Sequence, residues 1–324
     1  MDRRRAISTL AVAAGACVLP GISRSQASRI RRVGFVSGAQ TPVFFEAFRS
    51  GLLDLGYVEG KSVLFHARFG DGNNAHLIEV ATALVSERPD VIVTQGAAVR
   101  PVSRLAGDIP VVFGYSGDPV AAGMVKSLAR PGTNRTGISL LALDLVGKRM
   151  ELLKEALPRL KSVAVLANPE HPGEEFERRA AQSSADALGL QHTYFQARSA
   201  GELDATMAAI TKSAAEGLVV FPDGLTLANS RRIADSAIKM RAAAVAGWAQ
   251  FAENGFLMSY GPNLKASYRR LATFVDKILK GADPASLPIE LPSVVEMVVN
   301  TRTAQALALE IPRSVLLRAD RVES

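Results

Sequence analysis

The sequence has little of the chemistry on which disulfide scaffolds, metal sites and redox centres depend. Its 324 residues include one cysteine, Cys17, and four histidines, His66, His76, His171 and His192. A single cysteine excludes an internal disulfide framework and any cysteine-rich zinc or iron–sulfur site. The histidines share no i, i+4 spacing. We therefore interpret each as a surface or packing residue, and we expect neither a metal nor a cofactor.

Aromatic residues and basic stripes are also scarce, which argues against nucleic-acid binding. Phe, Trp and Tyr make up 6% of the chain, and the net charge is +7 from 38 basic and 31 acidic side chains. Removal of residues 1–27, which resemble an export signal, would take away four arginines and one aspartate and leave +4. We expect no nucleic-acid partner.

Hydrophobic residues make up 48% of the chain, as in globular proteins, and the length suits two domains.

The first 27 residues have the layout of an export signal. Three arginines, residues 3–5, precede seventeen uncharged residues, 6–22, and Ser25-Gln26-Ala27 then provides small residues around a cleavage point. This order predicts a secretory signal peptide that is cleaved after Ala27. Arg4-Arg5 also has the spacing of a twin-arginine signal. We therefore expect an exported, periplasmic protein.

Two alternatives for this segment stay open. Seventeen uncharged residues are marginal for crossing a bilayer, so a retained anchor is one of them. Lipidation of Cys17 is the other, although Ala14 stands where bacterial lipoprotein signals usually carry leucine. No later apolar run approaches eighteen residues, so we expect the mature protein to be soluble.

After residue 30 the chain alternates apolar runs with helical stripes. We predict strands at 33–36, 63–65, 91–93 and 110–113, with helices near 45–56, 77–85 and 97–106. The pattern restarts after residue 140, with strands at 163–166, 192–196, 218–221 and 245–248 and helices near 150–157, 174–188, 202–215 and 227–240. Apolar strands separated by amphipathic helices indicate parallel sheets covered on both faces.

The last seventy residues hold a strand at 256–261, a helix around 264–280 and a further strand and helix, which we interpret as chain that crosses back between the halves. The fold class that we predict is therefore α/β, with two Rossmann-like lobes, each a parallel sheet flanked by helices, and a hinge between them. We assign 30–138 and about 262–290 to the N-terminal lobe. The C-terminal lobe takes 139–261 and about 291–322.

Catalytic motifs are incomplete throughout the chain. Gly114-Tyr115-Ser116-Gly117-Asp118 resembles a serine-hydrolase elbow, but aspartate stands where that motif needs glycine. The span from Gly117 to Gly123 has the wrong spacing for a phosphate loop, and Met124 replaces the lysine. The first strand–helix turn lacks G-x-G-x-x-G. We therefore expect a binding protein and not an enzyme.

Polar side chains follow the predicted strands, where ligands of open parallel sheets bind. The candidates in the first half are Ser37, Gln40, Thr94, Gln95, Tyr115, Ser116 and Asp118, and those in the second half are Asn168, Asp223 and Trp248. These groups suit a small polar ligand with an apolar part.

Several candidates also have a purely structural interpretation. Asp118 precedes Pro119 and fits a helix N-cap, and Asn168-Pro169 and Asp223-Gly224 are typical turn pairs. Tyr115 follows an apolar strand and fits a core position, and Trp248 fits packing between a lobe and the hinge. Both interpretations stay open for each of these residues.

Five stretches of the sequence together resemble a bacterial family. They are residues 112–137 (with Asp118-Pro119-Val120-Ala121-Ala122-Gly123 and Pro131-Gly132-Thr133-Asn134), 151–158, 257–262, 275–281 and 311–320. They are similar to the ABC transporter substrate-binding proteins of periplasmic-binding-protein type 1 fold, and the similarity extends over residues 31–322. Some members are associated with tryptophan or other aromatic amino acids.

The resemblance implies a periplasmic receptor that closes around a small molecule and delivers it to an ABC permease, as a monomer. It places Tyr115, Ser116, Asp118 and Asn168 at the cleft. Many relatives have Gly-Thr-Pro in the loop where this chain has Thr94-Gln95-Gly96-Ala97, so the ligand is left open. A ligand-sensing domain of a signalling system and an exported enzyme are the alternatives.

Overall fold

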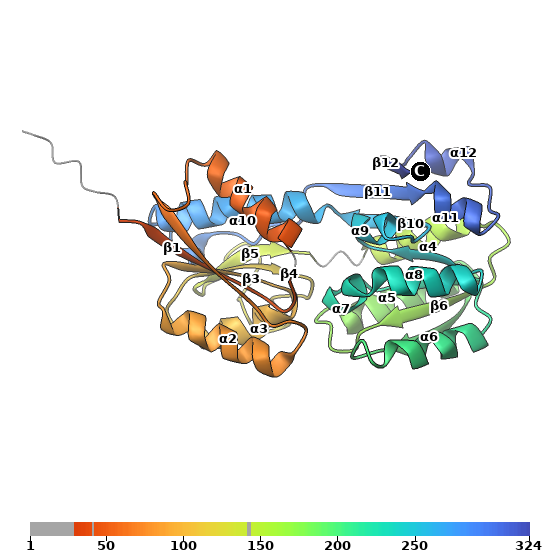
Figure 1. The fold of residues 1–324 in the computed structure, drawn as a ribbon, viewed down its shortest axis with the longest axis horizontal. Helices are drawn as coiled ribbons and strands as arrows, with labels where there is room; N and C mark the ends of the chain where they lie inside the picture. Colours follow the sequence, from red (N-terminus) through yellow and green to blue (C-terminus); the bar gives the residue numbers. More distant parts are fainter. Residues whose placement is uncertain (1–28, 41, 141–143) are drawn as a thin grey trace, which may run out of the picture.

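The computed structural model describes residues 29–40, 42–140 and 144–324, and it shows two lobes lying side by side (Figure 1). The predicted export signal, residues 1–27 with Cys17, lies outside the described residues. In the part of the chain that is described, no helix combines the length and the apolar character needed to cross a membrane.

The first lobe is built on a five-stranded parallel sheet with the strand order β2-β1-β3-β4-β5. The strands are β1 (Arg31–Ser37), β2 (Val63–Phe69), β3 (Val91–Gln95), β4 (Val111–Tyr115) and β5 (Arg135–Ser139). Side chains alternate between the two faces of each strand. Phe35 therefore packs with one helical layer, and the neighbouring Val36 packs with the other.

Helices cover both faces of this sheet (Figure 1). The first layer contains α1 (Pro42–Asp54) and α10 (Leu264–Leu279), and the second contains α2 (Asn74–Ser86), the short 3₁₀ helix η1 (Gly96–Ala98) and α3 (Val99–Leu105). Helix α10 comes from far along the chain, yet it packs closely on α1. The first lobe is therefore completed by the C-terminal part of the sequence.

The second lobe is built on a seven-stranded sheet with the order β12-β11-β10-β9-β8-β6-β7. Its strands are β6 (Ser162–Ala167), β7 (Gln191–Gln196), β8 (Gly217–Val220), β9 (Ala243–Ala246), β10 (Met258–Pro262), β11 (Val295–Asn300) and β12 (Arg321–Glu323). Neighbouring strands are parallel except β10 and β11. Strand β10 runs toward the first lobe and β11 runs back from it, so these two neighbouring strands are antiparallel.

Helices cover both faces of the second sheet as well. One layer contains α4 (Asp144–Ala156), α5 (Glu174–Ala187), α11 (Thr301–Ala306) and α12 (Arg313–Leu316). The other contains α6 (Leu203–Lys212), α8 (Ser230–Lys239) and α9 (Ala249–Glu253), with the short α7 (Gly224–Ala228) before α8.

The chain passes between the lobes after β5, after β10 and before β11 (Figure 1). Before the last passage, the 3₁₀ helix η2 (Pro284–Ser286) leads to Glu290, which forms a parallel bridge with Ile138 at the edge of the first sheet. The two-lobed α/β fold predicted from the sequence is thus confirmed. The lobe boundaries assigned from the sequence, near residues 138, 261 and 290, stay predictions.

Two predicted helices differ from those observed. The helix expected at 97–106 is divided into η1 and α3, and the helix expected at 227–240 is divided into α7 and α8. The second division falls at Asn229, whose backbone leaves the helical region (φ −106°, ψ 10°) and whose side-chain amide donates to the Leu225 carbonyl. Local polar contacts of this kind interrupt a helix without a proline or a glycine.

Candidate functional site

Loops that follow β4 and β6 bring the two lobes into contact. A Cβ atom placed on Gly117, after β4, would lie 2.8 Å from the Cβ of Pro172, after β6. Nearby, the side-chain amide of Asn74, at the start of α2, donates to Glu170 Oε2 across 3.3 Å. Figure 1 shows β4 and α7 on the facing sides of the lobes. The carboxyl ends of strands from both lobes are therefore directed toward this interface.

Three buried side chains of the first lobe form a hydrogen-bonded chain. Gln95 Nε2 donates to Ser37 Oγ across 2.7 Å, and the Tyr268 hydroxyl of α10 donates to Gln95 Oε1. Ser37 Oγ in turn donates to the Ala39 carbonyl at 2.8 Å. Burial raises the pKa of the Tyr268 phenol, so the hydroxyl keeps its proton. The chain links the ends of β1 and β3 to the helix that enters from the second lobe.

Two other first-lobe candidates are enclosed and carry unpaired hydroxyls. Thr94 and Tyr115 are both fully buried, and neither Thr94 Oγ1 nor the Tyr115 hydroxyl has a hydrogen-bond partner among the described residues. The Tyr115 ring packs edge-on against Phe113 at 6.3 Å between centroids. Burial raises the pKa of Tyr115, and nearby Arg100 opposes that rise. An unpaired buried hydroxyl costs about 1–3 kcal/mol, so these groups would gain most from a polar ligand atom.

The remaining first-lobe candidates lie nearer the surface. Asp118 is half-buried, and its Oδ1 accepts hydrogen bonds from the backbone amides of Val120 and Ala121 at 2.8 and 3.1 Å. Asp118 therefore caps a turn, whereas the helix N-cap considered from the sequence is wrong, because no helix lies among the described residues between β4 and β5. Ser116 is half-buried, whereas Gln40 is exposed and donates to Asp71 on the surface at 3.3 Å.

The second lobe brings Asn168 and Asp223 together at the ends of β6 and β8. Asn168 Nδ2 donates to Asp223 Oδ2 across 2.7 Å, and the Asp223 residue is only 7% exposed. Asp223 also caps α7, because Oδ1 accepts from the Thr226 amide at 2.7 Å and the Thr226 hydroxyl accepts in return from the Asp223 amide. A turn role and a site role therefore coexist in this carboxylate.

Trp248 lies at the end of β9 with 8% of its surface exposed. Its indole packs against Phe251 with 6.1 Å between ring centroids, within an apolar cluster that includes residues of both lobes. Gln250, two residues later, has its side-chain oxygen buried and unpaired among the described residues. Gln250 was not among the candidates from the sequence, although it closely follows the strand end at which Trp248 lies.

A buried charged cluster in the second lobe was also missed. Arg149 of α4 is 2% exposed, its Nε donates to the Tyr260 carbonyl at 2.9 Å, and its Nη1 lies 3.9 Å from Glu177 Oε1. Glu177 Oε2 in turn lies 3.2 Å from His171 Nε2. Burial lowers the pKa of the Arg149 guanidinium, and Glu177 opposes that shift. His171, which we interpreted as a surface or packing residue, is part of an ion-pair cluster behind the interface.

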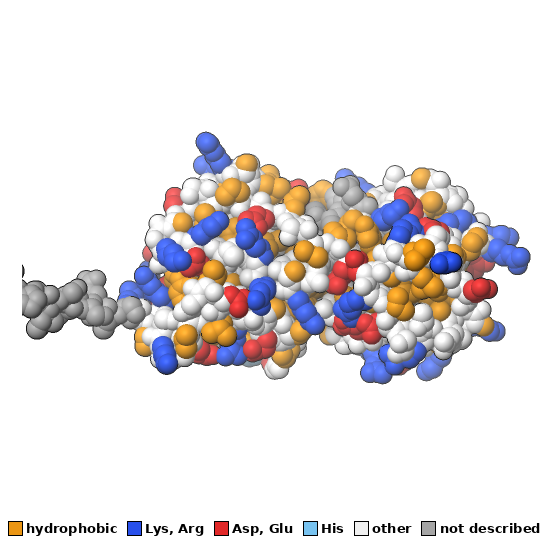
Figure 2. Space-filling view, turned by 90° about the horizontal axis from the view of Figure 1, so that it is seen from above, with side chains coloured by type: hydrophobic (Ala, Val, Ile, Leu, Met, Phe, Trp, Pro, Cys, Tyr) orange, Lys and Arg blue, Asp and Glu red, His pale blue; other side chains and the backbone are white. Residues whose placement is uncertain are grey.

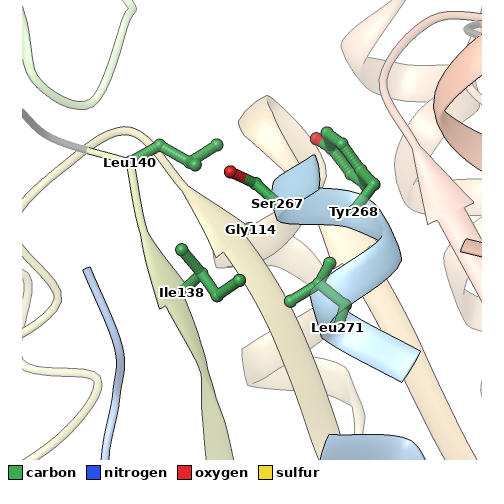
Figure 3. Close-up of a pocket in the computed structure, with 6 residues that line it drawn as sticks. All are labelled: Gly114, Ile138, Leu140, Ser267, Tyr268 and Leu271. Carbon is green, nitrogen blue, oxygen red and sulfur yellow. The ribbon is translucent and has the colours of Figure 1, made fainter. Parts of the chain in front are cut away.

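Two cavities lie beside helices of the two lobes. Figure 3 shows a narrow crevice in the first lobe, between the sheet and α10, lined by Gly114, Ile138, Leu140, Ser267, Tyr268 and Leu271. Its empty volume is about 140 Å³, but it is too narrow to admit a water molecule. A second groove, with an empty volume of about 550 Å³, lies on the second lobe between α6 and α8. Neither contains the candidate site residues.

Comparison with known proteins gives a consistent result. A family model described as ABC transporter substrate binding protein matches residues 32–323. The tyrosine-binding protein of Clostridioides difficile (strain R20291) is 21% identical over 267 residues, which are 82% of this chain and 76% of that protein.

Solved structures share the fold over almost the whole chain. A conserved domain protein from Vibrio cholerae has a TM-score of 0.83 at 28% identity and covers 91% of this chain and 100% of its own. An ABC domain in complex with L-Trp from Streptococcus pneumoniae has a TM-score of 0.82 at 23% identity, with 90% and 99% covered. The resemblance seen in the sequence motifs is confirmed: the chain belongs to the ABC transporter substrate binding protein family.

Proposed function

We propose that this protein is the exported solute receptor of an ABC importer and that it binds an amino-acid-like ligand between its lobes. The observation that carries the proposal is the convergence of polar strand ends from both lobes on one interface. Gly117 and Asn74 of the first lobe contact Pro172 and Glu170 of the second. A molecule held there would touch both lobes at once.

The chemistry of the strand ends supports an amino-acid-like ligand. The carboxylate of Asp223 is oriented by Asn168 and suits a ligand ammonium group, because charge-assisted hydrogen bonds are the stronger ones. The unpaired hydroxyls of Thr94 and Tyr115 suit polar ligand atoms on the opposite side. Since one relative is named for tyrosine and another is in complex with L-Trp, aromatic amino acids are the first candidates.

The mechanism that follows is closure of the hinge. A ligand that contacts both lobes binds the closed form more tightly, and so shifts the equilibrium toward it by that difference in affinity. An ABC permease in the inner membrane would then recognise the closed form. In this scheme the protein performs no catalysis and works as an exported monomer, with the predicted cleavage after Ala27 releasing it into the periplasm.

Surface charge fits a small-molecule receptor better than a nucleic-acid-binding protein. On the face shown in Figure 2, lysine and arginine side chains are scattered over both lobes among acidic ones. Nucleic-acid-binding surfaces instead gather basic groups into a patch or stripe. We therefore keep nucleic acids out of the proposed partners.

The first test is a search for the ligand. Native mass spectrometry of freshly purified protein should reveal a co-purified small molecule, and a thermal-shift screen of the twenty amino acids should raise the melting temperature for few of them. A ligand at a hundredfold excess over Kd stabilises the folded protein against unfolding by about 2.7 kcal/mol. Screening sugars alongside provides the control, and stabilisation by sugars with no amino acid active would contradict the ligand class.

A further inference from the structure

The loop formed by residues 168–173 is the part of the second lobe that meets the first lobe. Glu170 accepts the hydrogen bond from Asn74, and Pro172 lies against Gly117. The same loop begins with Asn168, which orients Asp223. The position of this loop therefore governs both the contact between lobes and the second-lobe side of the proposed ligand site.

One side chain of this loop is directed away from the interface. His171 is buried in the second lobe, with 2% of its side chain exposed, while Glu170 beside it is exposed. Its ring Nε2 lies 3.2 Å from Glu177 Oε2. Its backbone amide donates to the Asn168 carbonyl, and its carbonyl accepts from the Glu174 amide, both at 3.0 Å. His171 thus anchors the loop to α5.

The charges around His171 favour a protonated ring. Glu177 contacts it, Asp223 and Glu174 are near enough to act on it, and Arg149 pairs with Glu177. A protonated ring lies 3.2 Å from the Glu177 carboxylate and is attracted also by the carboxylates of Asp223 and Glu174. Breaking the balance of a buried ion pair is costly. Burial lowers the pKa of His171, but Glu177, Asp223 and Glu174 outweigh it and the net shift is upward.

We propose that His171 is a positioning residue, held as an imidazolium against Glu177, that fixes the loop 168–173 so that the second lobe can close on the ligand. This inference rests on the proposed function, because it concerns the same site. His171 itself touches no ligand. It acts through Asn168, Glu170 and Pro172, which lie on either side of it in the loop.

The direction of the pH dependence follows from linkage. The pKa of His171 is higher in the folded protein than in the unfolded chain, where it is about 6.5. The stabilising contribution is therefore complete below about pH 6.5 and is lost as the pH rises through the folded pKa. Loop order should decrease as the pH rises through that pKa.

The test follows the ring, the loop and the ligand separately. The imidazole resonances of protein labelled with ¹⁵N-histidine are followed against pH. The His171 resonance is the one that is absent in His171→Gln, and its pKa should lie above the ordinary pKa of histidine. Hydrogen exchange of the peptide covering 168–176, corrected for intrinsic rates, should accelerate over the same pH range. Titration with L-tryptophan and L-tyrosine over the same pH range tests the ligand class separately.

Two variants, at His171 and at Glu177, separate the ring from its partner. His171→Gln should abolish the pH dependence of loop exchange, and Glu177→Gln should lower the His171 pKa even if the first variant folds poorly. His192→Gln is the matched control, because His192 lies on β7 and makes no ion pair among the described residues. It should behave as the wild type does.

The outcomes also separate this inference from the proposed function. A His171 ring that is already neutral at pH 6.5, or loop exchange that ignores its titration, would overturn the positioning role. Failure of both amino acids to bind at any pH would contradict the proposed ligand class alone. The titration and the exchange are measured without ligand, and they still decide the role of His171.

Discussion

The carboxylate of Asp118 has two oxygens, and the fold uses one of them. Oδ1 accepts the backbone amides of Val120 and Ala121, which stabilises the turn after β4. Oδ2 accepts no hydrogen bond among the described residues, and the side chain is half-buried near the lobe interface. A capping role and a ligand role are therefore compatible at this position, and a pair of substitutions separates them.

We expect Asp118→Ala to lower the free energy of unfolding by about 1 kcal/mol, the usual cost of losing a cap. Asp118→Asn keeps an acceptor at the same place, so the stability should barely change. If Asp118 binds a ligand ammonium, that variant should nevertheless lose about 1–3 kcal/mol of binding free energy. Urea unfolding and calorimetric titration measure the two quantities. Unchanged affinity in Asp118→Asn would leave Asp118 with the cap alone.

Single residues at the site differ in how far the sequence predicts their place. Asn168 and Asp223 are 55 residues apart, yet their meeting follows from the rule that parallel strand ends share one edge. Arg149 and Tyr268 lie on helices, and their burial depends on which helices pack together. His171 follows β6, but its burial depends on the packing of α5 against the loop. The burial of Glu177 was partly predictable, because Glu177 shares the buried face of α5 with Ala181 and Ala185.

At the scale of elements, the loop after β4 is built for close approach to the loop after β6. A Cβ on Gly117 would lie 2.7 Å from Tyr115 ring atoms and 2.8 Å from the Cβ of Pro172. The backbone of Gly117 is not in the left-handed region, so it is space and not conformation that requires glycine here. The glycine thus permits the two lobes to touch.

We therefore expect Gly117→Ala to disfavour the closed form. Overpacking of this kind costs about 1–3 kcal/mol, which would weaken ligand binding by about tenfold or more. Calorimetric titration with the amino acid identified by thermal shift measures the loss, and urea unfolding shows how much of it comes from strain against Tyr115.

Gly224→Ala is the control for this substitution. Gly224 begins α7 on the facing side of the second lobe, and an added Cβ there meets nothing within 4 Å. It should bind ligand as the wild type does, with stability unchanged or slightly raised by the better helix former. Equal affinity in Gly117→Ala and Gly224→Ala would count against contact between these loops in the bound state.

The elements themselves were largely predictable, because apolar runs and helical stripes alternate clearly along the chain. The exceptions include β5 and α9, which no predicted range covers. Others have local or distant causes. Asn229 divides one predicted helix through its own hydrogen bond. The three-residue strand β12 is too short to show a pattern, and it is fixed by pairing with β11.

At the scale of the whole molecule, the segments that connect the lobes are tied to both sides of the site. Helix α10 follows the crossing after β10 and carries Tyr268, which bonds to Gln95 of the first lobe. Strand β10 offers the Tyr260 carbonyl to Arg149, which reaches Glu177 and through it His171. We therefore expect the proposed hinge motion to be coupled to the ends of β3 and β6.

Small-angle X-ray scattering with and without ligand tests the central claim most directly. The structure has the lobes in contact at Gly117 and Pro172 and at Asn74 and Glu170, as expected for a closed form. We predict that the protein stripped of ligand has a larger radius of gyration than the structure, and that the amino acid giving the largest thermal shift reduces it to the value of the structure. A tightly bound amino acid that leaves the radius of gyration unchanged would contradict closure of the lobes around the ligand.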